Sequence, residues 1–385
     1  MTADTLRNLD TAGGSAFLRM VRNNQRVIII VALVIALMLF FNSQSNGTFM
    51  TERNMSILIR QAAAAGVAAM AMAMMMIMKE IDISMGSSAY LCGVVMAMVA
   101  RDLEQTNSVV LILAALGTGL LIGLWQAFWI VIMRVPAFVA TIGGMLGYRA
   151  IGLVITGASP LSMPDGFSVM TELALPPMTV GIGGGAILVV VMLLLSNRVR
   201  RKGFSGGVLK AGVMTLLAVG VLLWAGTTGR VPTAIVWVAA VAFAMYLYMG
   251  RTRIGRNNYV VGANREAANL AGINTKRLVF GGFVLLGVIY AILATLLSSR
   301  LGSVGPQMGE LLEMDAIAGS VIGGISMTGG RGSVLGALGG ALLLVTIDNG
   351  LNFMDHVDAN WQPFIKAMIL LIAIAVDMRL HKEER

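Results

Sequence analysis

A run of glycines late in the chain is the segment that most resembles a ligand-binding loop. Residues 319–340 contain nine of them: Gly319, Gly323, Gly324, Gly329, Gly330, Gly332, Gly336, Gly339 and Gly340. Such a loop binds phosphate when a Gly-Lys-Ser/Thr sequence completes it, and this segment contains no lysine. The pairs Gly319/Gly323, Gly332/Gly336 and Gly336/Gly340 are spaced by four residues, which is typical of helices that pack closely within lipid. We therefore predict helix packing here and no phosphate site.

Residues that bind metals are scarce in this sequence. Cys92 is the single cysteine, so an internal disulfide and a cysteine-based metal site are both excluded. His356 and His381 are the two histidines, which is too few for a histidine metal site. We expect no metal and no cofactor bound directly to this chain.

The amino-acid composition identifies the class of protein to which this chain belongs. Apolar residues make up 57% of the 385 residues, charged residues make up 12%, and the mean hydropathy is +0.83. A soluble domain has about 25% charged residues, so this is a membrane protein. The long apolar runs lack the alternation of barrel strands, which leaves helices as the spanning structure. We predict an all-α, polytopic fold with about ten to twelve transmembrane helices in a single domain over residues 27–377.

Twelve apolar runs are candidate crossings. They fall at 27–41, 55–78, 88–100, 108–133, 137–156, 178–196, 211–226, 232–249, 278–297, 316–326, 333–347 and 362–377. The run at 316–326 is short and rich in glycine, so it is either a complete crossing or a half-helix that re-enters the bundle.

The distribution of basic residues predicts the orientation of the chain. With the N-terminus inside, 21 lysines and arginines fall in cytoplasmic segments and four fall in outer segments. This bias is the positive-inside rule, and it also accounts for the pI near 10.1 without any nucleic-acid partner. Residues 1–26 and 378–385 are therefore predicted to be cytoplasmic ends.

A short capped helix is predicted in the basic cytoplasmic stretch 250–277. Asn264 is a good N-cap, Glu266 lies in the first turn, and Gly272 can adopt the left-handed conformation that ends a helix. An isolated helix of two turns is marginal in water, which suggests that a partner packs against it. The alternative is a basic loop that merely obeys the orientation rule.

Two acidic residues stand at the starts of predicted spans. Asp82, followed by Ser84 and Gly86, precedes the third span, where it either caps the helix or contacts a bound ligand. Gly86 permits close helix contact. Asp315 is expected to be the N-cap of a helix over residues 316–324.

Three basic residues fall within predicted spans and need partners or water. They are Arg60, Arg149 and Lys366, and Asp348 is a candidate partner for Lys366. Ion-coupled carriers place acids deep in their spans, whereas the acids here fall at span ends or in loops. This argues for an external energy source.

Three motifs in order resemble monosaccharide permeases of bacterial ATP-binding-cassette importers. The stretch from Lys79 to Ser87 is similar to the family's Ile-Asp-Leu-Ser-Val-Gly signature, the stretch from Gly255 to Ile273 resembles its cytoplasmic loop, and the stretch from Glu313 to Ser333 resembles its C-terminal glycine-rich signature. Within the family the chain is most similar to D-xylose permeases, through Glu80, the tripeptide at 298–300, and the motifs at 347–350 and 354–355.

The resemblance implies a type II importer fold, in the inner membrane of a bacterium, with no enzymatic activity of its own. Two permease copies would form the path through the lipid, ATPase subunits that use ATP and magnesium would dock inside, and a periplasmic protein would deliver the sugar. The residues implied to contact the ATPase are Asn264, Arg265, Glu266, Ala267, Ala268 and Gly272. The residues implied to be structural or to line the path are Asp82, Ser84, Gly86, Asp315, Gly323, Gly324 and Asp348.

Three alternatives remain open on the sequence alone. The chain could be an ion-coupled sugar carrier that works by itself, or a membrane scaffold that transports nothing. It could also be a permease of the same family for ribose, galactose or arabinose.

Overall fold

The computed structural model describes residues 25–175 and 231–354, and isolated residues between 361 and 371. The predicted spans at 178–196 and 211–226 lie outside the described residues, as does most of the span at 362–377. The chain divides into two compact units, Met1–Ala32 with Ala174–Pro232 and Leu33–Leu173 with Thr233–Arg385. In the first unit, strands β2 (Ala174–Leu175) and β3 (Val231–Pro232) pair antiparallel.

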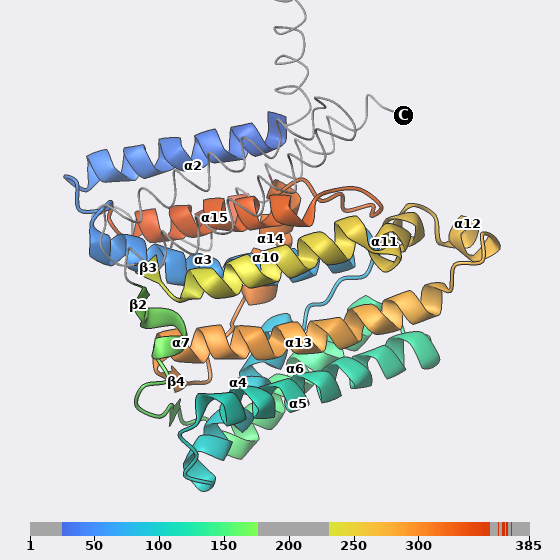
Figure 1. Ribbon diagram of the computed structural model, residues 1–385, viewed down its shortest axis with the longest axis horizontal. Coiled ribbons are helices and arrows are strands. Elements are labelled where there is room, and N and C mark those ends of the chain that lie inside the picture. Colours follow the sequence, from blue (N-terminus) through green and yellow to red (C-terminus); the bar gives the residue numbers. More distant parts are fainter. Residues whose placement is uncertain are drawn as a thin grey trace, which may run out of the picture. The chain divides into compact units, whose positions relative to one another are not determined.

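Long helices make up most of the described residues of the second unit and confirm the all-α prediction (Figure 1). The long helices are α2 (Gln25–Gln44, which begins in the first unit), α3 (Glu52–Ile77), α4 (Met85–Asp102), α5 (Ser108–Ala127) with its π-helical extension η1 (Phe128–Ile132), α6 (Ala137–Thr156), α10 (Ala234–Arg251), α13 (Thr275–Leu301) and α15 (Val334–Leu351), and the shorter α14 (Leu312–Ile322) packs against α3 and α15. Nine of the predicted spans lie on these helices. Among the described residues, six helices are long and apolar enough to cross a membrane.

Short elements occupy the two ends of this bundle. Helix α7 (Val169–Glu172) and the antiparallel pair of β1 (Leu161–Ser162) with β4 (Ser303–Val304) lie at one end, which we call the α7 end. Helices α11 (Arg253–Ala263) and α12 (Arg265–Leu270) lie at the opposite end, the α12 end (Figure 1). Sequence analysis predicted one short helix in this stretch, and the structure adds α11 before it.

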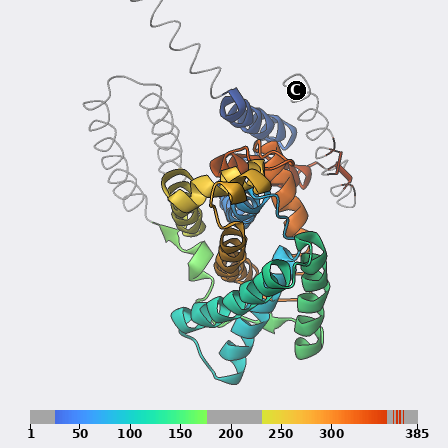
Figure 2. The same cartoon turned by 90° about the vertical axis from the view of Figure 1, so that its right-hand side faces the viewer.

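Helix α3 is the centre of the bundle and packs against α10, α13, α14 and α15 (Figure 2). Its last two turns are fully buried, and they carry the side chains of Met70, Met72, Met74, Met75 and Met76. In helices α5, α6 and α10, by contrast, only a minority of the residues is buried. This division matches a membrane protein, in which the outer helices face lipid and adaptable methionines fill the protein interior.

Helix α14 is too short to cross a bilayer. Its 11 residues extend about 16 Å at 1.5 Å per residue, against a hydrocarbon core of about 30 Å. Of the two alternatives for the run at 316–326, the structure therefore favours the half-helix. The expectation that Asp315 caps this helix is wrong, because the helix begins three residues earlier and Asp315 lies in its first turn. The residue at the N-cap is Leu311.

The packing role predicted for the glycines is confirmed between α14 and α15. A methyl group on Gly340 would lie 2.0 Å from the carbonyl oxygen of Gly319, and one on Gly323 would lie 2.4 Å from that of Gly336. The two backbones therefore touch where side chains would keep them apart. The pairing of Gly332 with Gly336 on one helix is wrong, because Gly332 precedes α15 and has a φ of +128°.

Candidate functional site

Two non-helical stretches enter the bundle from its opposite ends, and the second of them meets the start of α4 inside it. Residues 78–84 leave the end of α3 and lead to the start of α4, and residues 302–311 leave the end of α13 and lead to α14. A methyl group on Gly86 would lie 2.0 Å from the carbonyl oxygen of Gly309 and 2.7 Å from Glu313 Oε2. Both α4 and α14 thus begin within the bundle, the arrangement of discontinuous helices that membrane transporters use near their midplane.

A closed set of polar side chains fixes the end of the 78–84 stretch. Asp82 Oδ1 accepts hydrogen bonds from the Ser84 amide at 2.9 Å and the Ser84 hydroxyl at 2.7 Å, and Asp82 Oδ2 accepts one from the Tyr290 hydroxyl at 2.6 Å. Gln126 donates to Ser84 Oγ, and its Oε1 lies 3.0 Å from the Tyr290 hydroxyl. We call Asp82, Ser84, Gln126 and Tyr290 the midbundle cluster.

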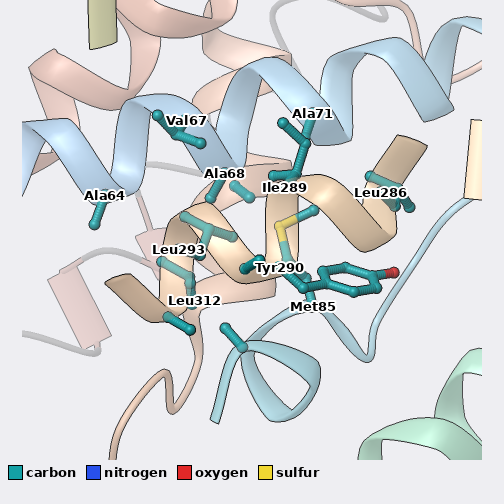
Figure 3. Packing of buried hydrophobic residues seen from close by; sticks show 14 of the residues in the cluster. Ala64, Val67, Ala68, Ala71, Met85, Leu286, Ile289, Tyr290, Leu293 and Leu312 are labelled. Carbon is teal, nitrogen blue, oxygen red and sulfur yellow. The ribbon is translucent and has the colours of Figure 1, made fainter. Parts of the chain in front are cut away.

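The midbundle cluster is sealed from solvent. Asp82 and Tyr290 are fully buried, and Tyr290 lies among apolar side chains of α13 and α3 that include Leu286, Ile289 and Ala68 (Figure 3). Each Asp82 oxygen already has a partner within the chain. In this state the cluster therefore serves to position α4 against α5 and α13. Asp82 caps the turn before α4, while Ser84 occupies the N-cap position itself.

The second stretch is held by Arg149 of α6. Its guanidinium donates to the carbonyl oxygens of Pro306 at 2.6 Å and Met308 at 2.9 Å, and lies 4.8 Å from the ring centroid of Tyr90. These carbonyls have no helix or sheet to pair with, so the arginine satisfies backbone groups that would otherwise be costly inside the membrane. The prediction that Arg149, a basic residue within a span, is paired or near water is confirmed by these two partners.

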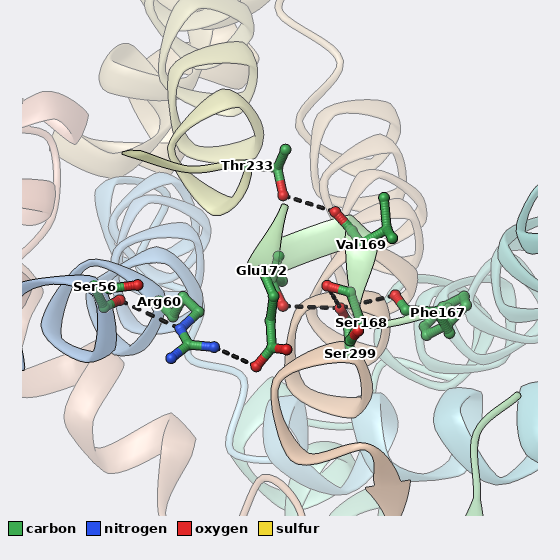
Figure 4. A network of polar contacts seen from close by, with 9 residues as sticks. Ser56, Arg60, Phe167, Ser168, Val169, Glu172, Thr233 and Ser299 are labelled. Carbon is green, nitrogen blue, oxygen red and sulfur yellow. Dashed lines mark hydrogen bonds and ion pairs between the residues drawn. The ribbon is translucent and has the colours of Figure 1, made fainter. Parts of the chain in front are cut away.

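Polar contacts at the α7 end attach α7 to two long helices (Figure 4). Arg60 of α3 forms an ion pair with Glu172, as expected for a basic residue within a span. The Ser299 hydroxyl of α13 donates to the carbonyl oxygens of Phe167 at 3.1 Å and Ser168 at 3.2 Å. These bonds fix the segment 167–172, which includes α7, to the bundle.

The short helix at the α12 end has the local structure that sequence analysis predicted. Asn264 Oδ1 accepts a hydrogen bond from the Ala267 amide at 3.0 Å, and Gly272 has a φ of +78°. Ala268 is buried against the bundle, whereas Glu266 is exposed. The helix is thus capped at both ends and seated on the protein by one face.

One ion pair joins this helix to the 78–84 stretch. The Arg265 guanidinium contacts Glu80 Oε1, and the Glu80 side chain is 8% exposed against 49% for Arg265. Burial raises the pKa of the Glu80 carboxyl, while the hydrogen bond and the charge of Arg265 act in the opposite direction. Because burial is the larger effect, Glu80 is protonated more readily than an ordinary glutamate.

The remaining predicted residues lie just after α14 and on α15. Gly323 ends α14 and packs on α15, and the next residue, Gly324, has a φ of +90° in the turn that follows. Asp348 lies on α15, and its suggested partner Lys366 lies outside the described residues.

An open cavity of about 440 Å³ lies at the α12 end. It is bounded by the 78–84 stretch and by the loop between α14 and α15, through Met76, Lys79, Ile81, Met327 and Thr328.

Sequence reasoning missed three features of this region. Gln126 and Tyr290 were treated as parts of apolar spans, although a glutamine within such a span signals a polar partner. Leu270 was not singled out, and it is 86% exposed on α12. The contact between Glu80 and Arg265 joins residues 185 positions apart, so spacing could not indicate it.

Comparisons with known proteins place these features among transport proteins. Residues 54–374 match the family described as the permease component of branched-chain amino acid transport systems. The xylose transport system permease protein XylH of Escherichia coli K12 is 36% identical over 380 residues, which cover 95% of each chain. XylH of Haemophilus influenzae is 32% identical over 94% of this chain and 98% of its own. The ribose import permease protein RbsC of E. coli K12 is 29% identical over 92% of this chain and 93% of its own. No solved structure matches.

Proposed function

The chain belongs to this permease-component family, and on that premise we propose that it is the membrane subunit of an ATP-driven importer of a monosaccharide, with D-xylose as substrate. Similarity to relatives named as xylose permeases, at 36% and 32% identity, exceeds that to a ribose permease at 29%. ATP would be hydrolysed, with magnesium, by separate ATPase subunits. A periplasmic protein would bring the sugar, and two copies of this chain would form the path.

The observation that carries this proposal is the form of helix α12. A short helix that is capped, seated on the bundle and exposed on its other face is suited to contact a partner. Leu270 is 86% exposed, and Glu266 lies one turn earlier on the same side of the helix. An exposed leucine beside a charged residue matches an apolar anchor with a polar rim. We assign this face to the ATPase.

The orientation follows from the distribution of charge. The α12 end would face the cytoplasm, because the predicted cytoplasmic segments hold most of the lysines and arginines. Both chain ends would lie on the same side, and the α7 end would meet the periplasmic protein. A neutral sugar needs hydrogen-bonding groups and not charges, and Thr328 offers a hydroxyl in the cavity at the α12 end.

Two substitutions in α12 test this assignment. Leu270→Asp places a charge where an apolar anchor is proposed, and Ala268→Pro removes the hydrogen bond from residue 268 to the Asn264 carbonyl. We expect each to reduce co-purification of the ATPase with the permease about tenfold or more, as loss of a central interface residue does. Membrane insertion should be unchanged, because neither residue lies in a span.

Leu301→Asp is the matched control, since Leu301 is an exposed leucine, 50% accessible, at the opposite end of α13. It should leave ATPase binding unchanged. Normal ATPase recovery with the two α12 variants would refute the docking face.

A further inference from the structure

Helices α11 and α12 contact two segments at the α12 end of the bundle. One is the end of α3 with the 78–84 stretch that follows it, and the other is the loop between α14 and α15. A methyl group on Gly262 would lie 1.6 Å from the carbonyl oxygen of Ile77 and 2.7 Å from the Gly330 amide. That amide donates to the Ile77 carbonyl at 2.9 Å. The Tyr259 hydroxyl donates to the carbonyl oxygen of Gly332 at 3.2 Å. The end of α11 is thus in direct contact with the end of α3 and with the loop between α14 and α15.

Arg265 adds a contact of a different kind. Its guanidinium is directed at Glu80 within the chain, although sequence analysis assigned it to the ATPase contact. Glu80 is nearly buried and precedes Asp82 by two residues, and Asp82 is held by Ser84 and Tyr290. One ion pair and two residues of chain therefore separate α12 from the midbundle cluster.

The burial of Glu80 distinguishes this pair from an ordinary surface ion pair. Exposed pairs contribute little because water competes with both partners. Here the Glu80 carboxylate is nearly buried. Removing Arg265 would leave that charge in a site of low polarity without its ion-pair partner, which is costly. A pair of this kind resists separation when one element moves.

From these contacts, and resting on the proposed function, we propose that Arg265 is a positioning residue for transport: its ion pair with Glu80 carries the movement of α12 to the 78–84 stretch and to the midbundle cluster. ATPase docking itself then depends on the exposed face of α12 and not on Arg265. Replacing Arg265 should therefore lower the sugar transported per ATP and leave ATPase binding unchanged. If Arg265 were simply a docking residue, its replacement would lower both.

The test measures two quantities on the reconstituted permease with its ATPase. One is the amount of ATPase bound, and the other is the amount of sugar transported per ATP hydrolysed. We expect Arg265→Gln and Glu80→Gln each to lower sugar transported per ATP about tenfold, in the range of measured coupling between sites. ATPase binding should stay within about twofold of wild type, since the docking face is intact.

The double variant and two further substitutions sharpen the result. Because both changes remove one interaction, the double variant should transport no less than either single variant. Arg265→Lys keeps the charge and should recover most of the coupling. Arg277→Gln removes an exposed arginine of the same region and should behave as wild type.

Three outcomes would overturn the proposal. They are loss of ATPase binding in Arg265→Gln, wild-type transport in Glu80→Gln, and additive losses in the double variant. In each case the wild-type complex still assembles and transports, so the result is distinct from failure of the proposed function. That failure would appear as no ATPase binding and no ATP-dependent uptake by the wild-type protein.

Discussion

Replacing Gly86 with alanine should lower the free energy of unfolding by about 3 kcal/mol or more and abolish transport. Overpacking a core costs about 1–3 kcal/mol when side chains can move. Here the obstacle is backbone, because the new methyl group would lie 2.0 Å from the Gly309 carbonyl oxygen. The contact between the start of α4 and the 302–311 stretch would be forced open.

Cys92 provides the measurement for this substitution. It is the single cysteine of the sequence and is fully buried on α4, so a thiol-reactive dye reports when that helix becomes accessible on heating. Gly143→Ala in α6 is the control, because nothing lies within 4 Å of the added methyl group. Helix propensity predicts that the control gains up to about 1 kcal/mol. Equal heat resistance of the two variants would show that α4 and the 302–311 stretch do not touch.

Replacing Asp82 with alanine should have an effect of similar size through loss of hydrogen bonds. The carboxylate accepts three hydrogen bonds in the midbundle cluster, and bonds to charged groups are each worth about 1.5–3 kcal/mol. Because such losses are not additive, we expect about 3–5 kcal/mol, the range found on breaking buried charged networks. Asp82→Asn retains one acceptor oxygen and should lose less.

The same thiol assay measures this loss, with Asp102→Ala as the control. Asp102 lies at the other end of α4, where it pairs with Arg101 on the exposed surface. Its removal should leave the unfolding temperature unchanged. Should Asp82→Ala unfold at the wild-type temperature while changing sugar transport, Asp82 would be a substrate contact and not a structural group.

The sequence predicted those features that depend on residues close together in the chain, such as the two ends of α12. The cap of α12 depends on Asn264 and the Ala267 amide, and its end depends on the left-handed conformation of Gly272. Both follow from residue type at a given spacing. Close helix packing in the glycine-rich segment was likewise predicted from glycines four residues apart, although their spacing did not show which two helices pair.

The depth of the non-helical stretches could not be predicted. Lys79 and Glu80 are charged, so hydropathy places them in a loop outside the membrane. The chain instead turns back, and Asp82 reaches the middle of α13 at Tyr290. Asp315 was assigned to the N-cap from residue type alone, but α14 begins at Leu312, its N-cap residue Leu311 makes no side-chain capping hydrogen bond, and the preceding Gly309 contacts Gly86, a residue far away in the sequence.

The most direct test of the account is ATP hydrolysis and sugar uptake by the permease and its ATPase in proteoliposomes. Adding the periplasmic binding protein loaded with D-xylose should stimulate hydrolysis and drive xylose into the lumen, while the protein loaded with ribose, galactose or arabinose should do neither. Xylose accumulation under an ion gradient with no nucleotide present would contradict the account, because the chain would then be a carrier that needs no ATPase.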